Sequence, residues 1–228
     1  MAVAAAETPA PNGVDEKLPK RHRRDNTGGP VREQQSLKEC VASNPDKSEL
    51  KVSATTDTRR FAGALAHVAR EHRDVKISAL SPANVNTAIK AVAVARDYVK
   101  EEGIDVGVVV HFRDQARRAL ELRYVTFDSR FNVPAEGSTV YTVGKSTNSA
   151  ATAGAVAARV REDTRPVLSC IGAGALIRAL TSVGIANEYI ERETHHKNEL
   201  LVIPYFTNES KGADTITVLN MCVVKIDV

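Results

Sequence analysis

The residues in this sequence best suited to chemistry are glycines and basic side chains near the starts of predicted helices. Gly172 and Gly174 lie where a predicted strand turns into a helix, and Arg178 follows one turn later. Glycine lets backbone N–H groups approach an anion, and the helix dipole favours negative charge at this end. The pattern predicts an anion site or, alternatively, a tight strand-to-helix connection in which only small residues fit.

Lys145 belongs to a segment, residues 143–147, that imitates the end of a nucleotide-binding P-loop. That motif requires a glycine five residues before Gly144, and this position is Thr139. The segment is therefore not a P-loop, but Lys145 remains a candidate contact to a phosphate.

Two pairs of arginines could follow a nucleic-acid backbone. Arg59 and Arg60 start the first predicted helix, and Arg117 and Arg118 lie in the loop before a predicted strand. Arginine is suited to phosphate contacts of this kind. The alternative is a solvated helix face with no partner.

The first 48 residues predict a disordered basic tail, because they contain few side chains that could be buried. Within it, residues 17–24 carry five basic side chains and no acid. Such a run is a nuclear-import signal, a contact to nucleic acid or an acidic protein surface, or a solvated patch. Its candidate contacts are Lys20, Arg21, Arg23 and Arg24.

The cysteines and histidines argue against a metal site or an enzyme. Cys40, Cys170 and Cys222 are far apart, with no Cys-x-x-Cys pair, so we expect no disulfide framework and a reducing compartment. The six histidines form no ligand set by spacing, and no nucleophile and base stand in a recognisable arrangement. We therefore expect no catalytic residue, no metal and no cofactor.

Net charge and hydropathy restrict the kinds of partner that the chain is expected to bind. The net charge is +3, with 8 basic against 7 acidic residues in the tail, 14 against 11 in residues 49–133, and 9 against 10 in residues 134–228. The basic excess thus lies in the tail and first half. No apolar run approaches the roughly 18 residues of a membrane span, so we expect no membrane partner.

The most informative feature is an internal duplication. A shift of 91 positions superposes residues 50–99 on 141–190 without a gap, and Ala62-Gly63-Ala64 then matches Ala153-Gly154-Ala155. A three-residue insertion at residues 195–197 changes the offset, so that Val108 corresponds to Val202. Insertions belong in loops. The chain divides into the tail, a first module over residues 49–133, which includes a connector, and a second over residues 134–228.

Hydrophobic periodicity gives both modules the order βαβαββ. The expected strands are 50–53, 75–80, 106–112, 120–127, 140–144, 166–171, 200–206 and 214–227, and the second-module helices are 148–162 and 174–191. This order predicts an α/β (α+β) fold in which each module is a four-stranded mixed sheet with two helices on one face. Because small exposed-sheet modules often pair, we also expect an internal pseudo-dimer.

Several segments resemble the stage V sporulation protein S (SpoVS) family. They are residues 50–54, 62–66, 88–96, 171–176 and 203–207. The resemblance implies an Alba-like fold, related in outline to the C-terminal domain of bacterial initiation factor three. It also implies a small dimer-forming regulatory protein that binds nucleic acid and has no catalytic activity.

The two copies have diverged in complementary ways. The second keeps the glycine turn of residues 172–175 where the first has Ser81-Pro82-Ala83-Asn84, whereas the first keeps Lys90 where the second has Thr181. If the family's surface site needs both the turn and the lysine, each copy retains half.

Two functions are expected from these observations. The first is a non-enzymatic tandem module that binds RNA or DNA through its basic tail and first repeat. The alternative is a structural component of a large assembly, such as an axonemal or cytoskeletal lattice or a ribonucleoprotein particle, bound through an acidic protein surface. The expected location is the cytoplasm, with a cytoskeletal, ciliary or nuclear site as further possibilities.

Overall fold

The computed structural model describes residues 49–116, 119–128, 130–134, 137–211 and 214–228. The predicted tail therefore lies outside the described residues, as do the candidate contacts Lys20, Arg21, Arg23, Arg24, Arg117 and Arg118. No helix in the described ranges has the length and apolar character needed to cross a membrane.

Both repeats contain the same order of strands and helices. The first consists of β1 (Glu49–Val52), α2 (Thr58–Arg70), β2 (Val75–Ala79), α3 (Pro82–Tyr98), the short 3-10 helix Lys100–Glu102, β3 (Asp105–Phe112) and β4 (Leu120–Phe127). The second consists of β5 (Val140–Val143), α4 (Ser149–Arg161), β6 (Val167–Cys170), α5 (Ala173–Glu193), β7 (Asn198–Lys211) and β8 (Asp214–Asp227). The insertion at residues 195–197 lies in the turn before β7, as expected of an inserted segment.

Side-chain caps explain where three of the four α-helices begin. Asp57 accepts a hydrogen bond from the backbone N–H of Arg60, and Ser81 does the same for Asn84. Asn148 caps α4 through the N–H groups of its first turn. Each cap satisfies N–H groups that have no partner within the helix. Helix α5 lacks such a cap, which matters for the site described below.

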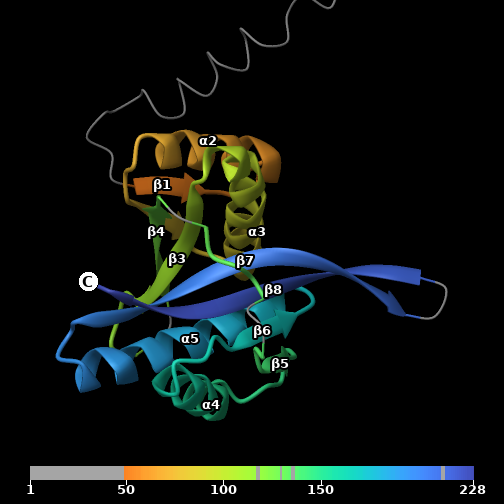
Figure 1. Ribbon diagram of the computed structural model, residues 1–228. Helices are drawn as coiled ribbons and strands as arrows, with labels where there is room; N and C mark the ends of the chain where they lie inside the picture. Colours follow the sequence, from red (N-terminus) through yellow and green to blue (C-terminus); the bar gives the residue numbers. More distant parts are fainter. Residues whose placement is uncertain (1–48, 117–118, 129, 135–136, 212–213) are drawn as a thin grey trace, which may run out of the picture.

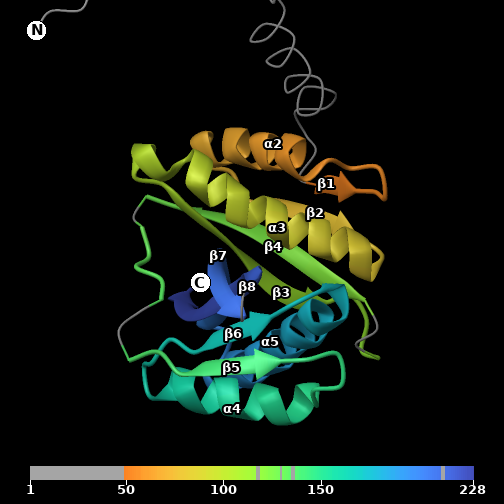
Figure 2. The ribbon, with the colours of Figure 1, turned by 90° about the vertical axis from the view of Figure 1, so that its right-hand side faces the viewer.

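The eight strands form one mixed sheet in the order β1-β2-β4-β3-β7-β8-β6-β5. Figures 1 and 2 show the two repeats as the upper and lower halves of the molecule, joined where β3 meets β7. The predicted mixed α/β fold is confirmed, but the strands of each repeat are part of this common sheet and do not form a separate one. Pairing with β7 satisfies backbone groups that β3 would otherwise leave open at an edge.

The junction between the repeats depends on a close approach of two backbones. Val108 pairs with Val202, which is its corresponding residue in the other repeat, and Val109 pairs with Leu201. A Cβ atom at Gly107 would lie 2.7 Å from the carbonyl oxygen of Val202. Only glycine fits this position without movement of the partner strand.

One face of the sheet packs against all four α-helices in a single core. The largest fully buried side chains there include Leu65, Ile89, Tyr124, Leu176 and Leu180. Helices α3 and α5 contact each other, and each also reaches the neighbouring repeat, α3 at β7 and α5 at β3. The repeats therefore share their core as well as their sheet.

A smaller apolar cluster lies on the opposite face, built on Val109, Leu201, Ile203 and Cys222. Phe131, in the connector between the repeats, packs against it and meets Phe127 edge to face, with ring centroids 5.2 Å apart. The connector thus covers part of the face that the helices leave open.

A buried ion pair ties three parts of the molecule together. Arg96 on α3 pairs with Asp105 at the start of β3, with Nε and Oδ1 2.5 Å apart, and both side chains are almost fully buried. Asp105 also accepts hydrogen bonds from the backbone N–H groups of Val106 and Phe131. The guanidinium donates further to the carbonyl of Pro204 on β7. Helix, connector and second repeat therefore meet at one ion pair.

The main departure from the prediction is the length of β7. The strand was expected over 200–206 but runs over Asn198–Lys211, so that β7 and β8 have 14 residues each where β3 and β4 have 8. Beyond Phe206, the side chains of residues 207–210 are polar and none of them is buried, which is why the apolar pattern predicted an earlier end. They are held by the ladder to β8, and this long hairpin projects beyond the rest of the sheet in Figure 1.

Candidate functional site

Helix α5 begins at a glycine that no other residue type could easily replace. Gly172 is the N-cap residue, and its φ of 85° is in the left-handed region that side chains disfavour. No side chain caps this helix, and its first turn contains no acid. A helix of 21 residues thus presents its positive end without a negative side chain beside it.

Two basic side chains of the second repeat lie beside this helix start. Lys145 comes from the turn between β5 and α4, and a Cβ atom at Gly174 would lie 3.5 Å from the Lys145 Cβ. Arg178, on the next turn of α5, donates from Nε to the Lys145 carbonyl at 3.3 Å. Both side chains are exposed. The predicted group of Gly172, Gly174 and Arg178 and the separately predicted Lys145 therefore lie on one continuous surface.

A third basic side chain comes from the other repeat. Lys90 on α3 lines a cavity of about 160 Å³ between the repeats, and Gly172 lines the same cavity. The remaining lining residues are Asn86, Cys170, Ile171, Leu176, Phe206, Thr217 and Leu219. The lysine and the glycine turn, which the sequence showed in different copies, are thus brought to one place.

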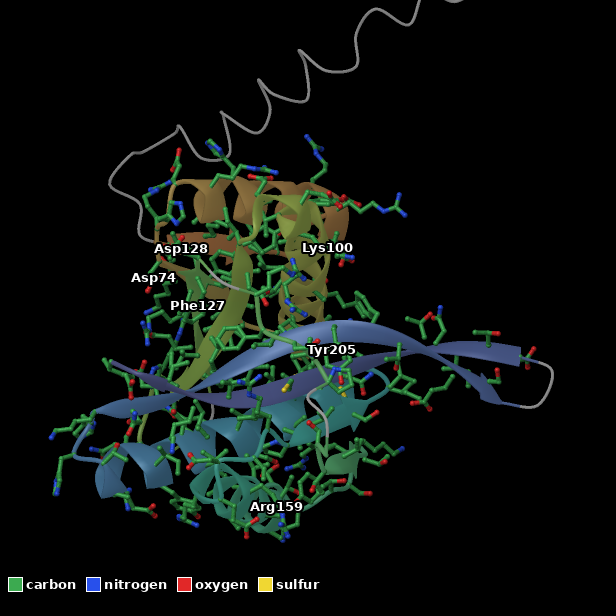
Figure 3. The ribbon with its side chains drawn as sticks, in the orientation of Figure 1. Asp74, Lys100, Phe127, Asp128, Arg159 and Tyr205 are labelled. Carbon is green, nitrogen blue, oxygen red and sulfur yellow. The ribbon has the colours of Figure 1, made fainter. Side chains whose placement is uncertain are left out.

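The cavity has one polar and one apolar side. Lys90 and Asn86 provide charge and hydrogen bonds from α3, while Ile171, Leu176, Phe206 and Leu219 form the apolar wall. Tyr205, labelled in Figure 3, belongs to the cluster on the opposite face of the sheet, so its neighbour Phe206 points toward the cavity. Ile171 is 61% exposed and Phe206 is 37% exposed, which leaves both open to a bound group.

The local charges favour an anion here. No acidic side chain that the structure describes forms an ion pair with Lys90, Lys145 or Arg178. Nine other basic side chains within the described ranges are held by acids, namely Arg70, Arg73, Lys76, Arg96, Arg113, Arg123, Arg159, Arg161 and Lys225. The three cations around α5 are therefore available to a ligand.

Cys170 forms part of the cavity wall but is a poor nucleophile. Burial raises the pKa of its thiol to about 11, and the nearby charge of Lys90 only partly opposes this. Burial likewise raises the pKa of Cys222 to about 11. Both thiols are almost entirely protonated at neutral pH, and the thiol is much less reactive than the thiolate.

The other predicted contacts do not join this surface. Arg59 and Arg60 lie in the first turn of α2, at the top of Figure 1, with α5 in the lower half. Arg60 has a partner within the protein. Asn86, Ile171 and Phe206 also line the site, and no sequence pattern indicated them as site residues. Their position could be recognised only once the two repeats were known to share one sheet.

Taken together, the fold is a duplicated α/β module with a basic, partly apolar cavity between its copies, which is the architecture of a small binding module. The family model for stage V sporulation protein S (SpoVS) matches residues 48–123 and 139–226, one match for each repeat. The chain therefore belongs to the SpoVS family, with two tandem domains.

Proposed function

We propose that this chain is a non-enzymatic nucleic-acid-binding module whose two repeats act as an internal pseudo-dimer with one working site. The observation that carries the proposal is that Lys90 of the first repeat opens onto the same cavity as the Gly172 turn of the second. Lys145 and Arg178 extend this surface along α5.

A phosphodiester backbone fits the chemistry of this surface. Phosphate oxygens accept hydrogen bonds from the uncapped N–H groups of α5 and from the three cations around them. The apolar wall of Ile171 and Phe206 offers contact to a sugar or base. The cavity admits one group of the polymer, so the rest of the strand would cross the surface toward Lys145 and Arg178.

Among the described residues that line the cavity, none is a suitable nucleophile, which supports a binding role over an enzymatic one. The two described cysteines hold their protons at neutral pH because burial raises their pKa values. Lys90 is exposed, and Asn86 beside it cannot act as a base. Phosphate binding at this surface requires charge and hydrogen bonds only.

Titration with a single-stranded oligonucleotide at several salt concentrations tests the proposal. Each phosphate contact contributes about 0.7 to the salt slope on single strands, so Lys90→Gln should lower that slope by about this amount and weaken binding at low salt. The matched control is Lys100→Gln, an exposed lysine of the first repeat that is labelled in Figure 3 and lies outside the cavity. Equal binding by both variants and the unchanged chain would refute the proposal.

A structural role in a large assembly is the second candidate, because the described surface also carries isolated apolar side chains. Leu80, which corresponds to Ile171 in the repeat, is 81% exposed, and Val140 is 58% exposed. An axonemal or cytoskeletal lattice, or a ribonucleoprotein particle, could bind these positions together with the projecting β7–β8 hairpin. Sedimentation of cell extracts separates the two functions, since a lattice component would be absent from the pool of free chains.

A further inference from the structure

A second polar cluster lies at the other end of the contact between the repeats. His111 on β3 stands between Glu191, near the end of α5, and Glu199, near the start of β7. Its Nδ1 is 3.5 Å from Oε1 of Glu191, and its Nε2 is 3.3 Å from Oε1 of Glu199. The side chains are 32%, 16% and 13% exposed, in that order, so all three are shielded from solvent yet reachable.

The duplication shows why this cluster has an excess of negative charge. Glu199 corresponds to Asp105, whose charge is balanced within its own repeat by Arg96. The position of Arg96 is Asn187 in the second repeat, and this neutral side chain donates to Glu191 and accepts from the N–H of Leu200. The second repeat therefore has one acid more and one cation fewer at this place.

A single arginine from the first repeat compensates only part of this charge. Arg123 on β4 pairs with Glu199, and it also contacts Asp74 with its Nη1 3.4 Å from Oδ2. One guanidinium thus serves two carboxylates, and the ion pairs of Arg123 among the described residues do not extend to Glu191. Partly buried carboxylates need a compensating cation or a hydrogen-bonded proton.

We propose that His111, Glu191 and Glu199 bind a divalent transition-metal ion of the zinc type. One imidazole nitrogen and two carboxylate oxygens are a ligand set that Zn²⁺ accepts. The three ligand atoms lie within 4.8 Å of one another. A tetrahedral ion with bonds of about 2.1 Å holds its ligand atoms roughly 3.4 Å apart, so small side-chain movements complete the site.

The insertion of the second repeat supplies a fourth ligand. His196 lies in the inserted turn with a left-handed φ of 61°, and its Nδ1 is 3.9 Å from Oε2 of Glu191. Its side chain is 77% exposed and can therefore rotate toward the ion. Arg123, which pairs with Glu199, competes with the metal for the charge of that carboxylate.

Such an ion would join the two repeats, because one ligand comes from β3 of the first and the others come from the second. It binds the folded chain in preference to the unfolded chain, so it raises the melting temperature as its concentration rises. This site is independent of the nucleic-acid surface proposed above.

The test uses the full chain after removal of metals by a chelator. We expect one Zn²⁺ per chain by calorimetry, a higher melting temperature in its presence, and a visible absorption band of four-coordinate Co²⁺. Loss of outer partners typically lowers metal affinity about 10- to 100-fold, so loss of a ligand in His111→Ala should exceed tenfold. Arg123→Gln should have the opposite effect on affinity, because it removes the competing cation.

The matched control is His67→Ala, which removes an exposed histidine 3.3 Å from Glu71 and should leave zinc binding unchanged. If His111→Ala does not fold, Glu191→Gln replaces it, and the Co²⁺ spectrum of the unchanged chain needs no variant. The proposal fails if the chain binds no Zn²⁺ at micromolar concentration, or if His111→Ala and His67→Ala bind it equally well.

Discussion

The turn from β6 into α5 and the turn from β2 into α3 occupy corresponding places in the two repeats, yet they differ in character. The first has Gly172 without a cap, and the second has Ser81, whose hydroxyl closes the helix start. Gly172 shares its cavity with Lys90 of the other repeat. At the second interface, Thr181 occupies the position that corresponds to Lys90. One of the two equivalent interfaces can therefore bind an anion, whereas the other has neither the uncapped glycine nor the lysine.

This difference shows what fusion of the two copies allows. In a dimer of identical chains, every substitution appears at both interfaces. In a single chain, each repeat changes independently, so the first could keep the lysine while the second kept the glycine turn. Substitutions at corresponding positions of the two repeats therefore measure how far the repeats have diverged.

The largest effect is expected at the buried ion pair, compared with its counterpart. Arg96→Met leaves Asp105 buried without its cation and should destabilise the fold by about 3–5 kcal/mol. Asn187→Leu removes the hydrogen bonds of a neutral side chain, to the Glu191 carboxylate and from the Leu200 N–H, and should cost about 1–3 kcal/mol. Urea unfolding of both variants measures the two values. If Arg96→Met lowered the free energy of unfolding no more than Asn187→Leu, the two corresponding positions would contribute alike to stability.

The next largest effect is expected at the junction of the sheet. A Cβ at Gly107 meets the backbone of Val202 at 2.7 Å, whereas one at Gly184 meets the ring of Phe112 at 3.0 Å. Overpacking costs about 1–3 kcal/mol, with the higher value where backbone must move. Gly107→Ala should therefore lower the thermal unfolding midpoint more than Gly184→Ala. A larger decrease in the midpoint for Gly184→Ala than for Gly107→Ala would mean that β3 and β7 separate easily.

A smaller effect is expected when the lost interface is restored. The double change Ser81→Gly and Thr181→Lys rebuilds the glycine and the lysine at the second interface. It should add about 0.7 to the salt slope for single-stranded nucleic acid and strengthen binding by a few-fold at low salt. The single change Ser81→Gly is the control, because it removes the cap without adding charge. No gain in the double variant would mean that the two interfaces are not equivalent.

The smallest effect concerns the thiol in the cavity. Because Lys90 lowers the pKa of Cys170 toward its usual value, Lys90→Gln should raise this pKa and reduce the thiolate fraction at pH 9. Alkylation of Cys170 at pH 9 should then slow, as measured by mass spectrometry of the peptide. Cys222 is the internal control, since its opposing charges are Arg165 and Arg96. Equal slowing of both thiols would indicate a general change in the fold.

Most elements of the fold could be predicted from the sequence, because periodicity and capping residues determine them locally. Asp57 and Ser81, for example, are residue types that commonly cap helices, and each caps the start of one here. The duplication allowed the elements of the second repeat to be predicted from those of the first. The end of β7 was missed because the residues beyond Phe206 have no apolar pattern and are held by backbone pairing and by hydrogen bonds between polar side chains of β7 and β8. The common sheet was missed because no local pattern records that β3 pairs with β7.

The site could be predicted only in part. The glycine turn, Lys145 and Arg178 are close in the chain or in the repeat pattern, so their types and spacing indicated an anion site. Lys90 was recognised as a candidate but was assigned to a separate half-site. Its meeting with Gly172, and that of His111 with Glu191 and Glu199, depend on how the repeats dock, which spacing along the chain does not encode.

The continuous sheet has a consequence for how the chain behaves among its own copies. Joining β3 to β7 leaves β1 and β5 as the two outermost strands, and each has only four residues. Short outer strands offer few open backbone groups for a neighbouring molecule to extend. The duplication therefore places the longer strands inside the sheet, and its two short outermost strands should resist extension by a neighbouring copy.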